Sequence, residues 1–313
     1  MLSKKQIGGL NKQQIEERVG ALTGTRAAIV KGTSRFDGDW YTLWSVMTGR
    51  SNDEIKPSLM MRLGHYTEPG NVAEYELKTG RKCRQVHKTL HHKKYDRLRG
   101  HPDRLIVGDK NRGVECKAVF QRSESDWDDG VPYYYIDQVM HYAMITGRMK
   151  WDFSVLFLAY GRHEIYELEF TKEDIADLLK KELEFLKYVD DDIAPEVTAF
   201  STKALKQEWK TTNVGAIKVA DARIESHVKA RQGYKDMHET VKGQLDLCEN
   251  KIRQHMEGSE ILIDGNGDTI ATYKANKSGS RRFNFNIKKE KKNGSNDTSK
   301  SNRKAGVGEA VQT

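Results

Sequence analysis

The sequence is poor in cysteine and contains no long apolar segment. Its three cysteines, Cys83, Cys116 and Cys248, are scattered, and their spacing fits neither a metal centre nor a disulfide framework. This usage suits a reducing compartment, so we expect a cytoplasmic protein. The longest purely apolar run, residues 155–160, is far shorter than the roughly 20 residues that span a bilayer. The first 20 residues are polar and lack the pattern of an export signal.

The positive charge of the chain is concentrated in two segments. The 313 residues carry a formal net charge of +8, with 53 Lys and Arg against 45 Asp and Glu. Residues 78–104 contain ten Lys or Arg against two Asp, and residues 281–304 contain nine against two acidic residues. The rest of the chain is therefore acidic. This distribution indicates a polyanionic partner, although a solvated loop and a charged tail would have the same composition.

Hydrophobic periodicity predicts helices and short strands in the first 200 residues. Helices are expected at residues 11–31, where a glycine turn separates two of them and the second opens near Thr25, and at 38–50, 57–79 and 133–147. Strands are expected at residues 84–90, 99–107, 114–120, 154–160 and 164–170. Thr171-Lys-Glu-Asp174 is a variant of the capping box, which predicts that a further helix begins there.

The character of the chain changes after about residue 203. Apolar residues recur at helical spacing between Ile224 and Ile252, which predicts one long amphipathic helix ending near Gly258. A hairpin with its turn at 264–268 is expected next, and residues 281–285 could add a third strand. The low-complexity residues that follow predict a disordered basic tail. We therefore divide the chain into a main domain, an extension and a tail, at residues 1–200, 201–287 and 288–313.

The strongest chemical signal is a pair of carboxylates beside a lysine. Asp103 follows Pro102, and twelve residues later Glu115 and Lys117 stand two positions apart in a strand-like segment. Side chains alternate along a strand, so Glu115 and Lys117 should share a face, with Asp103 on the neighbouring strand. Two carboxylates can bind a divalent cation such as Mg²⁺, and the Cys116 carbonyl could be a further ligand. The lysine could hold or help deprotonate a water, or stabilise charge on a phosphate.

In combination with other motifs, these residues resemble the YqaJ-like viral recombinase family, the lambda-exonuclease group of PD-(D/E)xK nucleases. The resemblance covers about residues 15–170 and rests on the segments Gly64-His-Tyr-Thr-Glu68-Pro69, Gly100-His-Pro102-Asp103, Glu115-Cys-Lys117 and Tyr135-Ile-Asp-Gln138-Val-Met-His-Tyr142. It implies an α/β core with a mixed central sheet flanked by helices. It also implies metal ligands at Asp103, Glu115 and Glu68, and catalytic positions at Lys117, Gln138 and Tyr135.

An N-terminal segment, Arg18-Val-Gly-Ala-Leu-Thr-Gly-Thr25, is also similar to the family. In relatives this segment helps to receive the 5′-phosphate of a DNA end. A hydroxyl at a helix N-terminus beside an arginine suits that role, although a simple helix cap at Thr25 would use the same residue. In the second basic segment, Arg281 and Arg282 are expected to contact DNA.

The chain departs from the family pattern at three positions. Arg104 stands where many relatives have glycine after the aspartate, Arg26 stands where an acidic residue is usual, and Gly100 replaces a small alanine or serine. None of these changes removes an expected metal ligand. The change at Arg26 bears instead on the expected phosphate pocket.

The resemblance implies a 5′→3′ exonuclease that acts on double-stranded DNA ends in a bacterial host cell. Such an enzyme uses Mg²⁺, for which Mn²⁺ could substitute, and resects ends for a single-strand annealing protein in phage recombination. Some family members form trimeric rings. A Cas4-like or restriction-type nuclease is an alternative, but a Cas4 iron–sulfur centre requires four clustered cysteines. A basic DNA-binding protein without enzymatic activity, in which Asp103 and Glu115 are structural, is another.

Overall fold

A computed structural model describes residues 18, 20–35, 38–52 and 58–286. These residues form two compact units, the first reaching Thr212 and the second beginning at Asn213. The first helix expected within residues 11–31 lies mostly outside the described residues, and the tail expected at 288–313 lies wholly outside them. No helix of the described part is long and apolar enough to cross a membrane.

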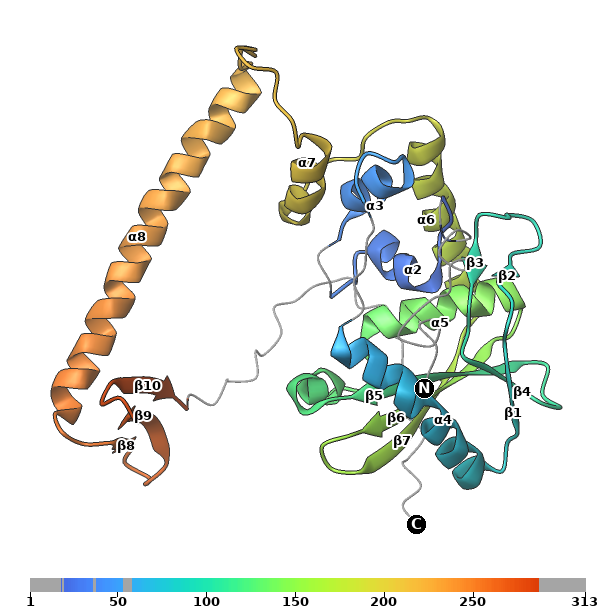
Figure 1. The fold of residues 1–313 in the computed structure, drawn as a ribbon, viewed down its shortest axis with the longest axis horizontal. Coiled ribbons are helices and arrows are strands. Elements are labelled where there is room, and N and C mark those ends of the chain that lie inside the picture. Colours follow the sequence, from blue (N-terminus) through green and yellow to red (C-terminus); the bar gives the residue numbers. More distant parts are fainter. Residues whose placement is uncertain (1–17, 19, 36–37, 53–57, 287–313) are drawn as a thin grey trace. The chain divides into compact units, whose positions relative to one another are not determined.

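The first unit is built on a five-stranded mixed sheet with the order β1-β4-β5-β6-β7 (Figure 1). The pair β5–β6 is parallel because a helix connects the two strands, whereas the other neighbouring pairs are antiparallel. A separate hairpin, β2–β3, precedes β4. This architecture confirms the mixed central sheet that the sequence predicts. The strands are β1 Cys83–Gln85, β2 Leu90–His91, β3 Arg99–Gly100, β4 Arg104–Ile106, β5 Arg112–Val119, β6 Lys150–Phe157 and β7 Arg162–Glu169.

Helices cover both faces of this sheet. Helix α4 lies on one face, and α5 lies on the other with α2 and α6 packed against it (Figure 1). The largest buried side chains, which include Trp151, Phe153 and Phe185, fill the layer between the sheet and α5 and α6. The helices of the unit are α2 Gly24–Lys31, α3 Trp40–Met47, α4 Leu59–Thr79, α5 Tyr133–Thr146, α6 Lys172–Asp190 and α7 Thr202–Glu208.

Local capping sets several of these helix ends. Thr171 and Asp174 form the reciprocal capping box at the start of α6, as the sequence predicts. Helix α2 begins at Gly24 with Thr23 as its N-cap residue, so the cap lies two positions before Thr25. Helix α7 packs on α3, where the Tyr41 hydroxyl donates to Glu208 over 2.6 Å. With contacts of this kind the first unit extends to Thr212. The domain boundary suggested by composition lies earlier, at residue 200.

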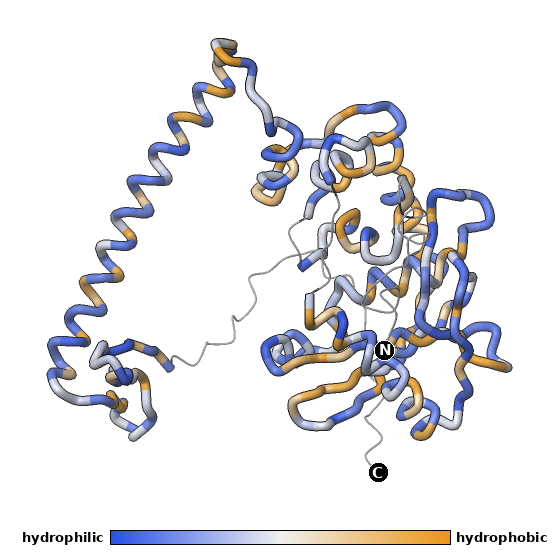
Figure 2. Tube along the Cα trace, viewed as in Figure 1, coloured by the Kyte–Doolittle hydropathy of each residue, from blue (hydrophilic) through white to orange (hydrophobic). Residues whose placement is uncertain are grey.

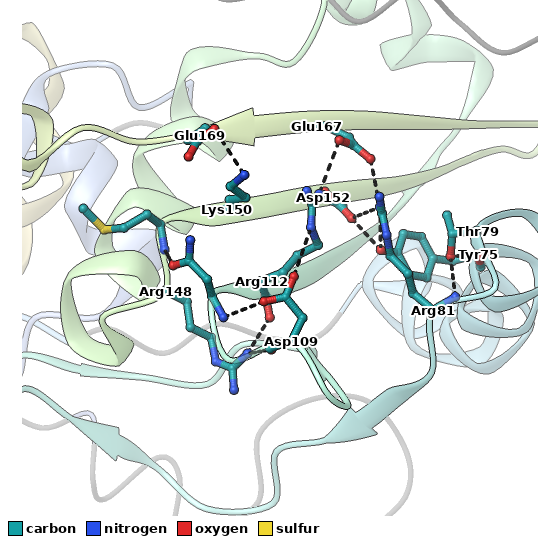
Figure 3. A network of polar contacts seen from close by, with 12 residues as sticks. Tyr75, Thr79, Arg81, Asp109, Arg112, Arg148, Lys150, Asp152, Glu167 and Glu169 are labelled. Atoms are coloured by element: carbon teal, nitrogen blue, oxygen red, sulfur yellow. Dashed lines mark hydrogen bonds and ion pairs between the residues drawn. The ribbon is translucent and has the colours of Figure 1, made fainter.

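A buried ion network fixes α4 to the sheet (Figure 3). Asp152, on β6, is fully buried and accepts hydrogen bonds from the Tyr75 hydroxyl and from the guanidinium groups of Arg81 and Arg112. One α4 turn earlier, the Asn71 amide donates to the carbonyls of Lys117 and Ser154, over 3.1 and 2.9 Å. Asn71 thus forms hydrogen bonds to both parallel strands. These bonds hold the preceding turn of α4 beside β5.

The second unit consists of a long helix and a small sheet. Helix α8 runs from Ala222 to Met256, and β8 Ile261–Ile263, β9 Thr269–Ala275 and β10 Arg281–Phe285 form an antiparallel sheet. Met256 and Ala271 are buried where the helix end meets the sheet. Apolar residues recur along α8 in Figure 2, and several of them are exposed. The long helix, the turn at 264–268 and the third strand all confirm the expected extension.

Candidate active site

Asp103 is positioned by the antiparallel pairing of β4 and β5. It directly precedes β4, and its Oδ2 accepts a hydrogen bond from the Cys116 backbone N–H over 2.9 Å. Burial raises the pKa of Asp103 well above its ordinary value, the negative charges of Glu115 and Glu68 raise it further, and Lys117 opposes them. A half-buried carboxylate in such negative surroundings is a favourable position for a cation.

Glu115 lies on β5 with 3% of its surface exposed. Its Oε1 accepts hydrogen bonds from Lys117 Nζ over 2.8 Å and from Gln138 Nε2 over 2.7 Å. Its Oε2 is buried and has no hydrogen-bond partner. An unpaired buried carboxylate oxygen is costly, so the atom fits the position of a metal ligand. The side chains present therefore suit a hard divalent cation held between Asp103 and Glu115.

Lys117 projects to the same face of β5 as Glu115, as the spacing predicts. Its Nζ lies 3.2 Å from Gln138 Oε1 and 4.3 Å from the centre of the Tyr135 ring. Burial lowers the pKa of Lys117, but the charges of Glu115 and Tyr135 outweigh that effect and the net shift is upward. The side chain is therefore an ammonium at neutral pH. It can donate hydrogen bonds and stabilise negative charge.

Gln138 and Tyr142 lie on one face of α5, one turn apart, and Gln138 Nε2 donates to the Tyr142 hydroxyl over 3.1 Å. The Tyr142 ring is held between two glycines. A β-carbon at Gly24 would lie 2.7 Å from the ring, and one at Gly100 would lie 2.9 Å from it. Glycine is therefore needed at Gly100, where the family has alanine or serine. The N-terminus of α2 and the end of β3 thus meet at the side chain that supports Gln138.

Glu68 is turned toward Arg104 in this structure. Glu68 Oε1 lies 2.6 Å from the Arg104 guanidinium, and His65 lies on its other side. Burial would raise the pKa of Glu68, but His65 and Arg104 outweigh it and the net shift is downward. Among the described residues, no three His, Cys, Asp or Glu side chains converge on one point. Glu68 thus pairs with Arg104 in this structure, and the metal roles of Asp103, Glu115, Glu68 and the Cys116 carbonyl stay predictions.

The structure also brings together Arg18 and Thr25, the residues of the expected phosphate pocket. The Arg18 guanidinium donates to the Thr25 hydroxyl over 3.3 Å, and the Thr23 hydroxyl lies 3.4 Å from that of Thr25. The N-terminus of α2 has no side-chain cap and no acidic residue in its first turn, which leaves its positive end to a ligand. Arg26 is buried and donates to the carbonyls of Arg18 and Ala21, over 2.9 and 2.7 Å. Arg26, at the position where an acidic residue is usual in the family, therefore holds in place the segment that carries Arg18.

The two arginines of the second unit differ in their surroundings. Arg281 donates to the carbonyls of Tyr273, Glu257 and Ser259 and lies over the Tyr273 ring, so it joins the end of α8 to the small sheet. Arg282 is exposed on β10. The geometry gives Arg281 a structural role, and Arg282 is the better placed of the two to contact DNA.

Sequence reasoning missed the buried residues that support this site. His141 contacts Glu182 of α6 through Nδ1 over 2.8 Å and the Arg99 carbonyl through Nε2 over 2.9 Å, and both ionisable side chains are fully buried. Asn71 was also missed. His141 precedes Tyr142 in one of the family motifs, and this position was the available sequence signal for its role. Its partners lie about 40 residues away on either side, and no spacing rule identifies them.

Comparisons with known proteins agree with this fold. Residues 15–149 match the model of the YqaJ-like viral recombinase domain. The chain is 27% identical over 275 residues to the uncharacterized protein YqaJ of Bacillus subtilis (strain 168), and the match covers 85% of this chain and 84% of that protein. The match over residues 15–149 confirms the resemblance read from the sequence. The relationship to YqaJ also extends well beyond this domain.

Solved structures with a similar fold include an alkaline exonuclease, LHK-Exo, from Laribacter hongkongensis. Its complex with dAMP has a TM-score of 0.50 and 21% identity, and the match covers 60% of this chain and 95% of that one. A second crystal structure of LHK-Exo has a TM-score of 0.49 and 20% identity, over 57% of this chain and 92% of that one. The likeness to the dAMP complex establishes the fold. The matched region includes nearly all of the exonuclease, whereas two fifths of this chain have no counterpart in it.

Proposed function

We propose that this protein is a Mg²⁺-dependent exonuclease that degrades double-stranded DNA ends in the 5′→3′ direction. The observation that carries the proposal is the cluster at Glu115: Lys117 and Gln138 donate to its Oε1, and its Oε2 is buried and unpaired. Asp103 is held on the neighbouring strand by the Cys116 N–H. The family match and the fold agree with a DNA exonuclease as the class of enzyme.

Each residue of the cluster has a distinct proposed role. Asp103 and Glu115 would hold Mg²⁺, with Glu68 and the Cys116 carbonyl in support, and Mn²⁺ could replace it. Mg²⁺ would supply Lewis-acid stabilisation of the scissile phosphate and a more acidic water. Lys117, fixed by Glu115 and by the Tyr135 ring, would stabilise the negative charge that develops on that phosphate.

Gln138 would orient the attacking water. Its amide contacts both Glu115 and Lys117, and Tyr142 restrains it from the other side. Such restraint favours the reaction because the amide that orients the water is already in position before the reaction begins. The Arg18–Thr25 pair would receive the 5′-phosphate of the DNA end. It lies one layer of side chains from the metal site, since Gly24 packs on Gln138 and Tyr142.

The biological role that fits this chemistry is resection of DNA ends for a single-strand annealing protein, during phage-type recombination in the cytoplasm of a bacterial host. A trimeric ring around DNA is the proposed assembly. The catalytic part would be the first unit, and the second would act as an extension. A Cas4-like enzyme is disfavoured because the cysteines are too few and Cys248 is exposed, far along the chain from Cys83 and Cys116.

Digestion of linear duplex DNA tests the proposal. Substrates with 5′-phosphate and 5′-hydroxyl ends are incubated with and without Mg²⁺, and strand-specific labels report the direction. We expect Mg²⁺-dependent release of nucleotides from 5′-phosphorylated ends first. Cleavage that is independent of metal, or that begins at 3′ ends, would contradict it.

A further inference from the structure

The hairpin β2–β3 and its flanks, residues 84–101, form a strongly basic surface, which we call the basic hairpin. It contains six Lys or Arg against Asp96, whose carboxylate is already paired with Arg99 and His91. Lys88, Lys93 and Lys94 are exposed, and in the described part of the chain no carboxylate lies within ion-pair distance of them. The segment is predominantly hydrophilic in Figure 2. Three cations without counter-ions form a site for a polyanion.

The base of the basic hairpin is firmly attached to the rest of the site. Leu22 exchanges backbone hydrogen bonds with Arg97 and Arg99, over 2.8 and 2.9 Å, and Arg97 also donates to the Gly20 carbonyl. These bonds join the hairpin to the segment that links Arg18 to α2. The buried His141 holds the Arg99 carbonyl from the other side. The lysines are thus presented by a fixed support.

The basic hairpin also leads directly to the metal site. Gly100 is three residues from Asp103, a separation of at most about 10 Å along the chain. Thr89 Oγ1 lies 3.0 Å from His101 Nε2, so Lys88, two residues before β2, lies beside the loop that runs from Gly100 to Asp103. Since His91 pairs with Arg99, Lys93 and Lys94 lie in the connecting loop at the far end. The three lysines are therefore spread along the hairpin in the direction away from the metal site and the Arg18 pocket.

We propose that the basic hairpin binds the phosphate backbone of the duplex DNA that leads into the active site. This inference rests on the proposed function and adds a binding surface to it. Flexible lysines suit such contacts because they neutralise phosphates without reading sequence. The aromatic ring available there, Tyr95, is half-buried and covered by His92 and Lys94. These contacts occupy the ring that a base would stack on, so the surface favours a duplex over a single strand.

The test is the salt dependence of DNA binding by the full-length chain without divalent metal, so that no cleavage occurs. The variant Lys88→Ala/Lys93→Ala/Lys94→Ala is compared with a control of equal charge, Lys172→Ala/Lys180→Ala/Lys187→Ala, from the exposed face of α6. With three phosphate contacts removed, the slope of log K against log salt should fall by roughly 2 to 3 and Kd rise by roughly 10- to 100-fold. The control should keep the wild-type slope, and unchanged thermal transitions establish folding.

Three outcomes would overturn the inference. Equal losses in both variants would mean that net charge alone matters, and no loss in the hairpin variant would mean that DNA does not contact it. A loss as large on a single strand of the same sequence would contradict the assignment to duplex DNA. The proposed nuclease function fails separately, because a wild type that cleaves nothing with any metal would still give an interpretable binding slope.

Discussion

The guanidinium of Arg104 lies 2.6 Å from Glu68 Oε1, so the residue after Asp103 neutralises a carboxylate expected to serve the metal site. Both side chains are largely buried. The pairing explains how the chain accommodates an arginine where many relatives have glycine. It also makes Arg104 a competitor of a metal ion for Glu68.

We therefore expect Arg104→Ala to lower the Mg²⁺ concentration needed for half-maximal cleavage. An ion pair of this kind contributes about 1 kcal/mol or less, so the shift should be a few-fold. The measurement is a Mg²⁺ titration of cleavage rate, with Arg104→Lys as the control that keeps the charge. A higher Mg²⁺ requirement in Arg104→Ala would show that Arg104 supports the site.

Removal of a carboxylate ligand should separate catalysis from binding. Asp103→Asn and Glu115→Gln should abolish cleavage while duplex binding persists or tightens, because negative charge near the phosphates is lost. Asp103→Asn should also raise the Tm of the metal-free protein, since the repulsion between this carboxylate and those of Glu115 and Glu68 is lost. Calorimetry and binding assays measure both effects. Loss of the thermal transition in both variants would mean that the pair is structural.

Lys117→Ala should reduce cleavage by roughly 10²-fold or more, because removal of one donor that stabilises transition-state charge has that effect in other enzymes. Mg²⁺ binding should survive, since Asp103 and Glu115 remain. Lys117→Arg is the matched control that keeps the positive charge. Single-turnover kinetics on a 5′-phosphorylated duplex provide the readout, and a rate within a few-fold of wild type would exclude Lys117 from the chemistry.

The Arg18–Thr25 pocket predicts a preference for phosphorylated ends that depends on Arg18. A charge-assisted hydrogen bond contributes about 1.5–3 kcal/mol, so Arg18→Ala should slow digestion of 5′-phosphorylated ends by roughly 10- to 100-fold. Ends with a 5′-hydroxyl should be nearly unaffected. Both substrates are measured with both proteins as a double cycle. If the phosphate preference survives the mutation, the pocket lies elsewhere, and the basic hairpin becomes the candidate.

The buried pair His141–Glu182 predicts a pH dependence of stability. Burial lowers the pKa of His141, but the Glu182 carboxylate and the Arg99 carbonyl outweigh it and the net shift is upward. A raised pKa in the folded state stabilises the protein fully below the unfolded pKa, near 6.5, and this contribution is lost as pH rises through the folded value. The free energy of unfolding should therefore fall as pH rises above about 6.5.

Glu182→Gln is the control for this effect. The amide can donate to Nδ1 of a neutral His141 while Nε2 still donates to the Arg99 carbonyl, so the geometry is retained without a charge. The difference in unfolding free energy between wild type and Glu182→Gln should be largest at low pH and shrink as pH rises. Denaturant unfolding between pH 5 and 9 measures it, and parallel curves would refute this account.

Arg281 and Arg282 should respond oppositely to mutation. Arg281→Ala removes donors from three carbonyls and should destabilise the second unit by about 1–3 kcal/mol in thermal unfolding. Arg282→Ala should leave stability unchanged and weaken duplex binding, with a salt slope reduced by roughly 1. Equal stability losses in the two variants, or unchanged binding by Arg282→Ala, would contradict this assignment.

The sequence alone was sufficient for features that depend on local geometry. Glu115 and Lys117 share a face because they are two residues apart on a strand, and Gln138 and Tyr142 meet because they are four apart on a helix. The capping box at Thr171 and the long helix α8 follow from equally local rules. The family motifs added the order in which these parts occur, and hence the mixed sheet.

Only the tertiary structure decided which distant residues complete the site. Arg104 with Glu68, His141 with Glu182, and Tyr142 between Gly24 and Gly100 join segments that are tens of residues apart or more. Such pairs have no period or spacing in the sequence, because the sheet and the helices packed on it set their distances. The sequence likewise could not show that Glu68, one of the three expected carboxylates, pairs with Arg104. A folded neighbour, Arg104, satisfies the third, and residue types alone could not reveal that contact.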